Sequence, residues 1–143
     1  MTTALAASAL FTAALAVDTG SQRTAGTAQG RVRPPGAVEC APERLTAYTG
    51  MVSRFSRERD RTIVEIRTDW DTTERVVIAH QGDGPEPWFL LRAKPFGPEG
   101  WKAIESAPGR LRQGIRASAW ICEGGKNPIV DWNPATEPPP PGR

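Results

Sequence analysis

The sequence has few of the residues that most often carry catalysis. It contains a single histidine, His80, and no serine or cysteine close to it in sequence completes a recognisable nucleophile pair. The G-x-S-x-G, H-E-x-x-H and glycine-rich phosphate-loop motifs are all absent. We therefore expect a protein that is not an enzyme. A small hydrolase whose catalytic residues meet only in the folded chain is a weaker alternative.

Charged side chains are missing from the first seventeen residues, which are rich in alanine and leucine. This run is shorter than the roughly 20 apolar residues that a membrane-spanning helix needs. Its end, Ala14-Leu15-Ala16, resembles the small-residue site that a signal peptidase cleaves. The pattern predicts a signal peptide at residues 1–16 and a periplasmic or secreted protein with no membrane span after processing. An uncleaved N-terminal anchor is the alternative.

Only two cysteines are present, Cys40 and Cys122. In an oxidising compartment they can form the one possible intramolecular disulfide bond. It would close a loop of roughly 80 residues and add about 4 kcal/mol to the free energy of unfolding. In a cytosolic protein both cysteines would instead be free thiols.

Apolar periodicity is absent from both ends of the exported chain. Residues 17–39 consist mainly of Gly, Ser, Thr, Gln, Ala, Arg and Pro, a composition that predicts a flexible linker because it buries too little apolar surface. Residues 134–143 include four consecutive prolines, which predict an extended, disordered tail. The remaining residues, 40–133, are enough for one domain with one small core.

Five segments of this domain have β-strand character: residues 45–56, 62–70, 74–80, 111–122 and 129–132. In the second of them Val64, Ile66 and Trp70 alternate with charged residues, as in a half-buried strand. Gly50 marks an expected bend or bulge in the first. The apolar residues 88–91 can form a short extra strand. One helix is expected at residues 98–107, where Pro108-Gly109 ends it.

Three strands, a helix and two further strands follow one another in the order of an OB-fold, the five-stranded Greek-key β-barrel. Residues 45–132 therefore resemble a small exported bacterial OB-like domain in element order and in the glycine of the first strand. The resemblance implies that the first and fourth strands pair antiparallel, which would bring Cys40 close to Cys122. Another small sandwich or barrel is the alternative fold.

The resemblance also implies a ligand face on the second and third strands and on the loops between strands one and two and between strands four and five. Arginine binds carboxylate and phosphate groups through paired hydrogen bonds, so basic residues there favour an anionic ligand. Their competing role is to form ion pairs within solvated loops. The candidate ligand-binding residues are Arg57, Arg59, Arg61, Arg67, Arg75 and Lys126.

Three acidic residues, Asp69, Asp71 and Glu74, surround the expected turn between the second and third strands. Their oxygen atoms suit Ca²⁺ or Mg²⁺ and make a weak metal-site candidate, although Asp and Thr are also ordinary turn formers. We expect no other cofactor. Nucleic acid is not expected as a partner, because the exposed face of these strands mixes both charges and offers no aromatic ring for a base to stack on.

These observations favour a non-enzymatic exported domain that recognises a partner protein or a small anionic ligand. The alternative is an accessory structural subunit that docks on a larger periplasmic enzyme. Docking predicts that Trp88, Trp101 or Trp132 is exposed on an apolar patch.

Overall fold

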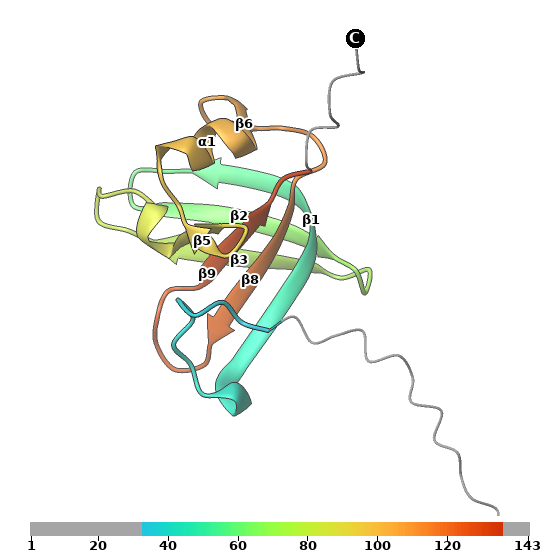
Figure 1. Ribbon diagram of the computed structural model, residues 1–143, viewed down its shortest axis with the longest axis vertical. Helices are drawn as coiled ribbons and strands as arrows, with labels where there is room; N and C mark the ends of the chain where they lie inside the picture. Colours follow the sequence, from blue (N-terminus) through green and yellow to red (C-terminus); the bar gives the residue numbers. More distant parts are fainter. Residues whose placement is uncertain (1–32, 136–143) are drawn as a thin grey trace, which may run out of the picture. The chain divides into compact units, whose positions relative to one another are not determined.

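The computed structural model describes residues 33–135, and the account below concerns these residues. The expected signal peptide and most of the expected linker and tail lie outside this range. Within it the domain is mainly β with one short α-helix, as the sequence predicts (Figure 1). None of the described helices is long and apolar enough to cross a membrane.

Seven strands form one sheet in the order β3-β2-β1-β8-β9-β4-β5, and β6 and β7 form a separate hairpin. The seven strands of the sheet, in chain order, are β1 Leu45–Arg57, β2 Arg61–Thr68, β3 Thr73–Ala79, β4 Phe89–Leu91, β5 Lys94–Pro95, β8 Arg116–Cys122 and β9 Ile129–Asn133. The remaining elements are the helix α1 Pro98–Ile104, the strands β6 Glu105–Ala107 and β7 Arg110–Leu111, and the 3₁₀ turns Pro42–Arg44 and Glu86–Trp88.

The prediction of a five-stranded barrel is therefore wrong in two respects. The described residues contain nine strands and not five. Strands β4 to β7 are only two or three residues long, and such short strands show too little periodicity in the sequence to be predicted from it alone. The sheet also does not close, because β3 and β5 are its two edges. The five expected strands are all present as β1, β2, β3, β8 and β9, and the expected extra strand is β4.

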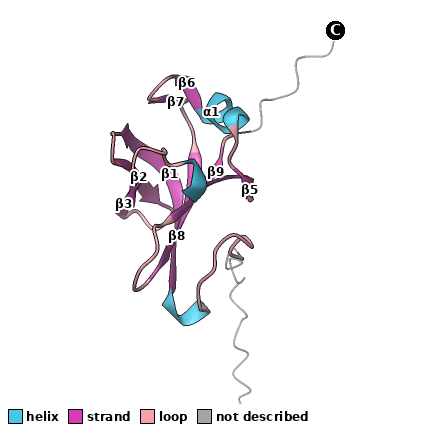
Figure 2. Cartoon of the chain, turned by 90° about the vertical axis from the view of Figure 1, so that its left-hand side faces the viewer, coloured by secondary structure: helices cyan, strands magenta, loops and turns pink. Residues whose placement is uncertain are grey.

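The helix is shorter than expected. It ends at Ile104 because residues 105–107 pair with β7 instead of continuing the helix. Helix α1 and the β6–β7 hairpin lie at the same end of the sheet (Figure 2).

Strands β1 and β8 pair antiparallel, with Leu45 opposite Cys122. This confirms the pairing expected for the first and fourth predicted strands. Cys40 and Cys122 form a disulfide bond whose Cα atoms are 5.8 Å apart, as predicted. Such a bond is typical of a protein that matures outside the cytoplasm.

Gly50 is buried between β2 and β8, and it is not the site of the bulge that the sequence suggested. The register of β1 against β2 shifts between Val52 and Arg54 instead. A Cβ atom at Gly50 would lie 2.0 Å from the carbonyl oxygen of Arg67. Glycine is therefore required for the close approach of two backbones.

The core lies under one face of the sheet and is rich in aromatic rings. Phe89 is 1% exposed, and its ring centroid lies 5.2–5.8 Å from those of Phe96, Trp101 and Trp132. These rings meet edge to face, the arrangement that aromatic quadrupoles favour. The aromatic cluster packs helix α1 and the segment from β4 to β5 against the sheet.

Candidate functional site

An open cleft of about 520 Å³ lies between the β1–β2 turn and the loop that follows β3. Arg57, Glu58 and Arg59 line it from the first segment. The loop contributes the other lining residues, which are His80, Gly82, Gly84 and Pro85. Two of the six predicted ligand-binding residues, Arg57 and Arg59, therefore meet in one cleft.

The loop after β3 reaches the cleft through two glycines in the left-handed region. Gly82 has a φ of 85° and Gly84 a φ of 77°, conformations that glycine adopts without steric cost. Their backbone amides make no hydrogen bond to a backbone carbonyl of the described residues. Both glycines line the cleft together with the two arginines.

Trp101 and Glu105 hold the guanidinium group of Arg57 in place. Its Cζ atom lies 4.3 Å from the centre of the Trp101 ring, a cation–π contact, and a terminal nitrogen lies 3.9 Å from Glu105 Oε1. Trp101 in turn donates a hydrogen bond from Nε1 to Glu86 Oε1 at 2.8 Å. Arg57 is therefore oriented before any ligand arrives.

One positive charge of the lining has no ion-pair partner among the described residues, because Arg57 faces Glu105 and Glu58 is paired with Arg61. Glu58 is the only carboxylate in the lining, and its Oε2 atom accepts a 2.7 Å charge-assisted hydrogen bond from Arg61 Nε. Arg59 makes no ion pair among the described residues. Asp60 and Asp83 belong to the same two loops but do not line the cleft.

His80 lines the cleft and is only 4% exposed. Its Nε2 atom lies 3.1 Å from the hydroxyl oxygen of Thr62, and its Nδ1 atom is buried without a partner among the described residues. Thr62 is fully buried, so its hydroxyl is out of reach of a substrate, and no carboxylate of the described residues orients the imidazole as a catalytic base requires. The arrangement supports a structural role for His80.

The other four predicted ligand-binding residues do not line the cleft. Arg61 is paired with Glu58 as described above. Arg67 lies 3.5 Å from Asp71, and Lys126 lies 3.4 Å from Glu39 near the disulfide bond. Arg75 is on β3, at the edge of the sheet.

The three acidic residues of the β2–β3 turn have other partners. Asp69 accepts two hydrogen bonds from Arg116, at 2.6 and 2.9 Å, Asp71 pairs with Arg67, and Glu74 accepts one from the Thr72 hydroxyl. Within residues 33–135 no group of three or more His, Cys, Asp or Glu side chains could hold a metal ion. The structure therefore uses these residues as turn-forming and ion-pairing groups.

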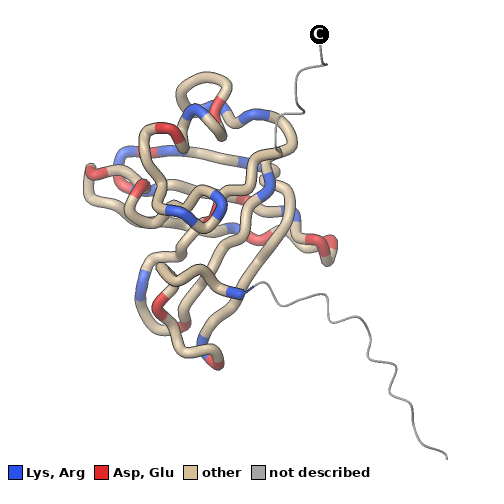
Figure 3. The backbone as a smooth tube through the Cα atoms, viewed as in Figure 1, with Lys and Arg blue, Asp and Glu red and all other residues tan. Residues whose placement is uncertain are grey.

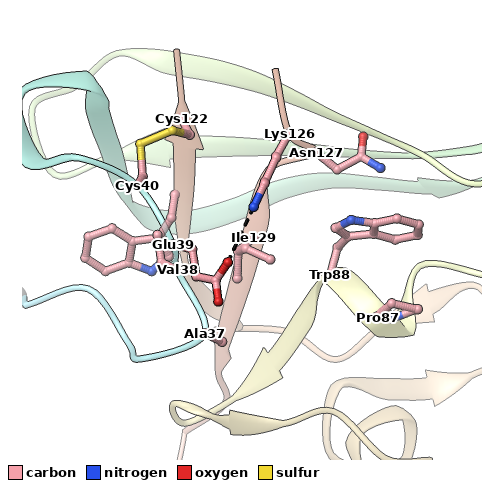
Figure 4. Close-up of a pocket in the computed structure, with 11 residues that line it drawn as sticks. Ala37, Val38, Glu39, Cys40, Pro87, Trp88, Cys122, Lys126, Asn127 and Ile129 are labelled. Carbon is pink, nitrogen blue, oxygen red and sulfur yellow. Dashed lines mark hydrogen bonds and ion pairs between the residues drawn. A yellow bond between two sulfur atoms is a disulfide. The ribbon is translucent and has the colours of Figure 1, made fainter. Parts of the chain in front are cut away.

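A second hollow, of about 170 Å³, lies beside the disulfide bond (Figure 4). Trp88 and Ile129 contribute apolar walls, and the ion pair between Lys126 and Glu39 borders it. Residues 37–39, which composition assigned to the linker, also line this hollow.

The exposed tryptophan is not one of those that the docking hypothesis named. Trp132 is fully buried, and Trp88 and Trp101 are partly buried, whereas Trp70 is 81% exposed. Trp70 lies beyond the last residue of β2, Thr68, so the alternation that suggested a buried position no longer applies there.

Basic and acidic residues are interspersed along the backbone (Figure 3). Comparisons with family models, with curated proteins and with solved structures found no match to this chain.

Proposed function

We propose that this chain is a periplasmic or secreted, non-enzymatic domain that binds a small anionic ligand in the cleft between the β1–β2 turn and the β3–β4 loop. The observation that carries the proposal is that Arg57, oriented by Trp101 and Glu105, and Arg59, which has no ion-pair partner among the described residues, line one cleft. The only carboxylate in the lining, on Glu58, is already paired with Arg61. The volume of the cleft is within the range of roughly 300–1,000 Å³ that small-molecule sites have in proteins.

An OB-like architecture is consistent with this site and is part of the proposal. The five longest strands follow the order β3-β2-β1-β8-β9. The last residue of the first strand, Arg57, and the loop after it, with Arg59, supply the two arginines. In OB-folds that loop contributes to ligand binding. The second contributing loop here follows β3, whereas the resemblance implied the loop between β8 and β9.

The ligand carries a carboxylate or phosphate group. Two guanidinium groups bind such oxygens in paired hydrogen bonds. Because Arg57 is fixed against Trp101, little side-chain entropy is lost when it binds.

Titration of the exported chain with citrate and with inorganic phosphate tests the proposal. We expect a saturable rise in melting temperature with at least one of them, and a tenfold or greater loss of affinity in Arg59→Ala, equivalent to about 1.4 kcal/mol. Arg54→Ala is the matched control, because Arg54 is exposed on β1 and does not line the cleft. Equal affinity of the Arg59→Ala variant and the wild type would contradict the proposal.

A second candidate function, an accessory subunit that docks on a larger protein, is favoured by one observation. Trp70 is 81% exposed at the tip of the β2–β3 hairpin, and tryptophan is enriched among the residues that dominate binding energy at interfaces. A docking role requires that Trp70→Ala lose the partner while it keeps the wild-type melting temperature.

A further inference from the structure

The two edges of the seven-stranded sheet differ in how they are protected. The edge strand β5 is only two residues long and one of them is proline, so it offers few free backbone groups with which another strand could pair. The other edge strand, β3, has seven residues and contains no proline, glycine or lysine (Figure 1). Its pairing with β2 runs without a register shift. A long, regular edge of this kind is a template for another strand.

The hydrogen bonds of the hairpin show which backbone groups of β3 are unused. The N–H of Thr68 donates to the carbonyl of Thr72, and that of His80 donates to the carbonyl of Asp60. Since hydrogen-bonded pairs alternate along an antiparallel ladder, the even-numbered residues of β3 bond to β2. The odd-numbered residues, Thr73, Arg75, Val77 and Ala79, direct their N–H and C=O groups away from the sheet.

At one end of this edge the side chain of Asn127 forms the hydrogen bonds that a neighbouring strand would otherwise make. The N–H of Ala79 donates to Asn127 Oδ1 at 3.2 Å, and its carbonyl accepts from Asn127 Nδ2 at 2.6 Å. The backbone groups of Thr73, Arg75 and Val77 have no such partner among the described residues, and all three residues are exposed.

We propose that the outer edge of β3 binds an extended peptide segment of a partner protein by β-strand addition, which supplies backbone hydrogen bonds to Thr73, Arg75 and Val77. This interaction is separate from anion binding in the cleft. Its specificity follows from the side chains on the exposed face. Arg75 lies opposite Glu65 in β2 but forms no ion pair within the described residues. An acidic partner residue beside Arg75 and an apolar one beside Val77, which is 38% exposed, fit this edge.

A second copy of the chain fits the edge less well. Antiparallel self-pairing centred on Arg75 would set two like charges directly opposite each other, which is destabilising. Self-pairing centred on Val76 would require Ala79, whose backbone groups are already bonded to Asn127. In that register only Arg75 and Val77 are left to pair between the two copies.

Amide hydrogen exchange of the exported chain, followed by NMR, tests the proposal with a defined probe. The probe is the capped peptide Val-Thr-Glu-Thr-Val, and the control peptide carries Lys in place of Glu. In the free chain we expect fast exchange at Thr73, Arg75 and Val77 and slow exchange at the even-numbered residues of β3. The probe should slow exchange at the first three at least tenfold and in a saturable manner, whereas the control peptide should not.

Two variants separate backbone pairing from side-chain recognition. Val77→Pro removes an outward N–H that takes no part in the hydrogen bonds to β2, so the variant should fold. The probe should no longer slow amide exchange at Thr73 and Arg75 in this variant. Val77→Thr keeps that N–H and a β-branched side chain, and it should keep the effect. Arg75→Glu should exchange the preference, so that the Lys peptide protects the edge and the Glu peptide does not.

Three results would overturn the proposal. Protection of the odd-numbered amides in the free chain at all concentrations would mean that another segment of this chain covers the edge. Protection that grows with protein concentration would mean that a second copy covers it. Fast exchange that the probe does not change would mean that the edge accepts no strand.

Discussion

The β2–β3 and β4–β5 turns both place residues other than glycine at positive φ, but different parts of the chain hold them. In the β2–β3 turn, Asp71 has a φ of 59°. The hydroxyl oxygen of Thr68 accepts hydrogen bonds from the backbone N–H groups of Trp70 and Thr72, at 3.3 and 3.2 Å, and lies 2.8 Å from the Thr72 hydroxyl. The bend around Asp71 is therefore held by residues within four positions of one another, although Asp69 in the same turn also bonds to Thr49 of β1 and Arg116 of β8.

The β4–β5 turn is held from a distance. Arg92 and Ala93 have φ values of 49° and 63°, and alanine has no side-chain group that stabilises this conformation. The N–H of Ala93 donates to Asp131 Oδ1 at 2.9 Å, and the N–H of Arg92 donates to the carbonyl of Trp132 at 3.0 Å. The positive φ of the first turn is therefore stabilised by neighbouring residues, whereas that of the second depends on β9 being in place.

Asp131→Ala should have the largest effect of the substitutions that separate the two turns. It removes the acceptor that holds Ala93 at positive φ, and a hydrogen bond to a charged group contributes about 2 kcal/mol to stability. Urea unfolding should show a loss of about that size in the free energy of unfolding. A loss below about 0.5 kcal/mol would mean that the turn does not need its distant partner.

Asp131→Asn is the matched control, because it keeps an acceptor oxygen, and it also tests the charge. Burial raises the pKa of Asp131, and the hydrogen bond from Ala93 opposes part of that rise. Because the pKa of Asp131 is raised in the folded state, protonation of this residue adds to the free energy of unfolding. The added stability is complete below the unfolded-state pKa of about 3.9 and is lost as the pH rises through the folded-state pKa. The melting temperature of the Asn variant, relative to the wild type, should therefore increase from acid to neutral pH. A constant difference would exclude this linkage.

Thr68→Val should have a smaller effect, because it removes the local hydroxyl and keeps the shape of the side chain. The N–H groups that it leaves belong to exposed residues, which water can solvate, so we expect a loss of about 1 kcal/mol in the free energy of unfolding. Thr46→Val, at an exposed position of β1, is the control and should change stability by less than about 0.5 kcal/mol. Equal losses in both variants would show that the hydroxyl does not hold the turn.

Ala93→Gly should have the smallest effect and the opposite sign. Glycine removes the steric cost of positive φ but gains entropy in the unfolded chain, so we expect a net stabilisation of about 0.5 kcal/mol. Asp71→Gly should give no gain, because aspartate tolerates the left-handed region and its ion pair with Arg67 is lost. Differential scanning calorimetry of both variants checks this contrast, and a stabilised Asp71→Gly would reverse it.

The same distinction explains how much of the fold the sequence could predict. The alternation of Val64 and Ile66 with charged residues is local, and it identified β2 correctly. The two cysteines added one long-range constraint, and together with the OB-like element order it predicted the pairing of β1 with β8. Strands β5 to β7 are only two or three residues long, which is too short for a periodic pattern to show. The apolar run at residues 88–91 did indicate β4, but not its parallel pairing with the distant strand β9.

The candidate site divides in the same way. Arg57 and Arg59 were predictable because a charged turn between two strands is visible in sequence. Their meeting with Gly82 and Gly84 was not, because it depends on how the β3–β4 loop folds back. The glycines themselves were a signal of a sharp turn, but sequence alone does not say which surface such a turn faces.

The position of β1 between β2 and β8 has a consequence for the order of events during synthesis. A chain that emerges amino terminus first presents β1, β2 and β3 as a meander whose core-facing side has nothing to pack on. The neighbour of β1 on its other side, β8, is almost the last element to appear, and Cys40 has no partner until Cys122 has followed it. The domain therefore completes its fold in a late step, and until then Cys40 is a thiol that can pair with cysteines of other proteins.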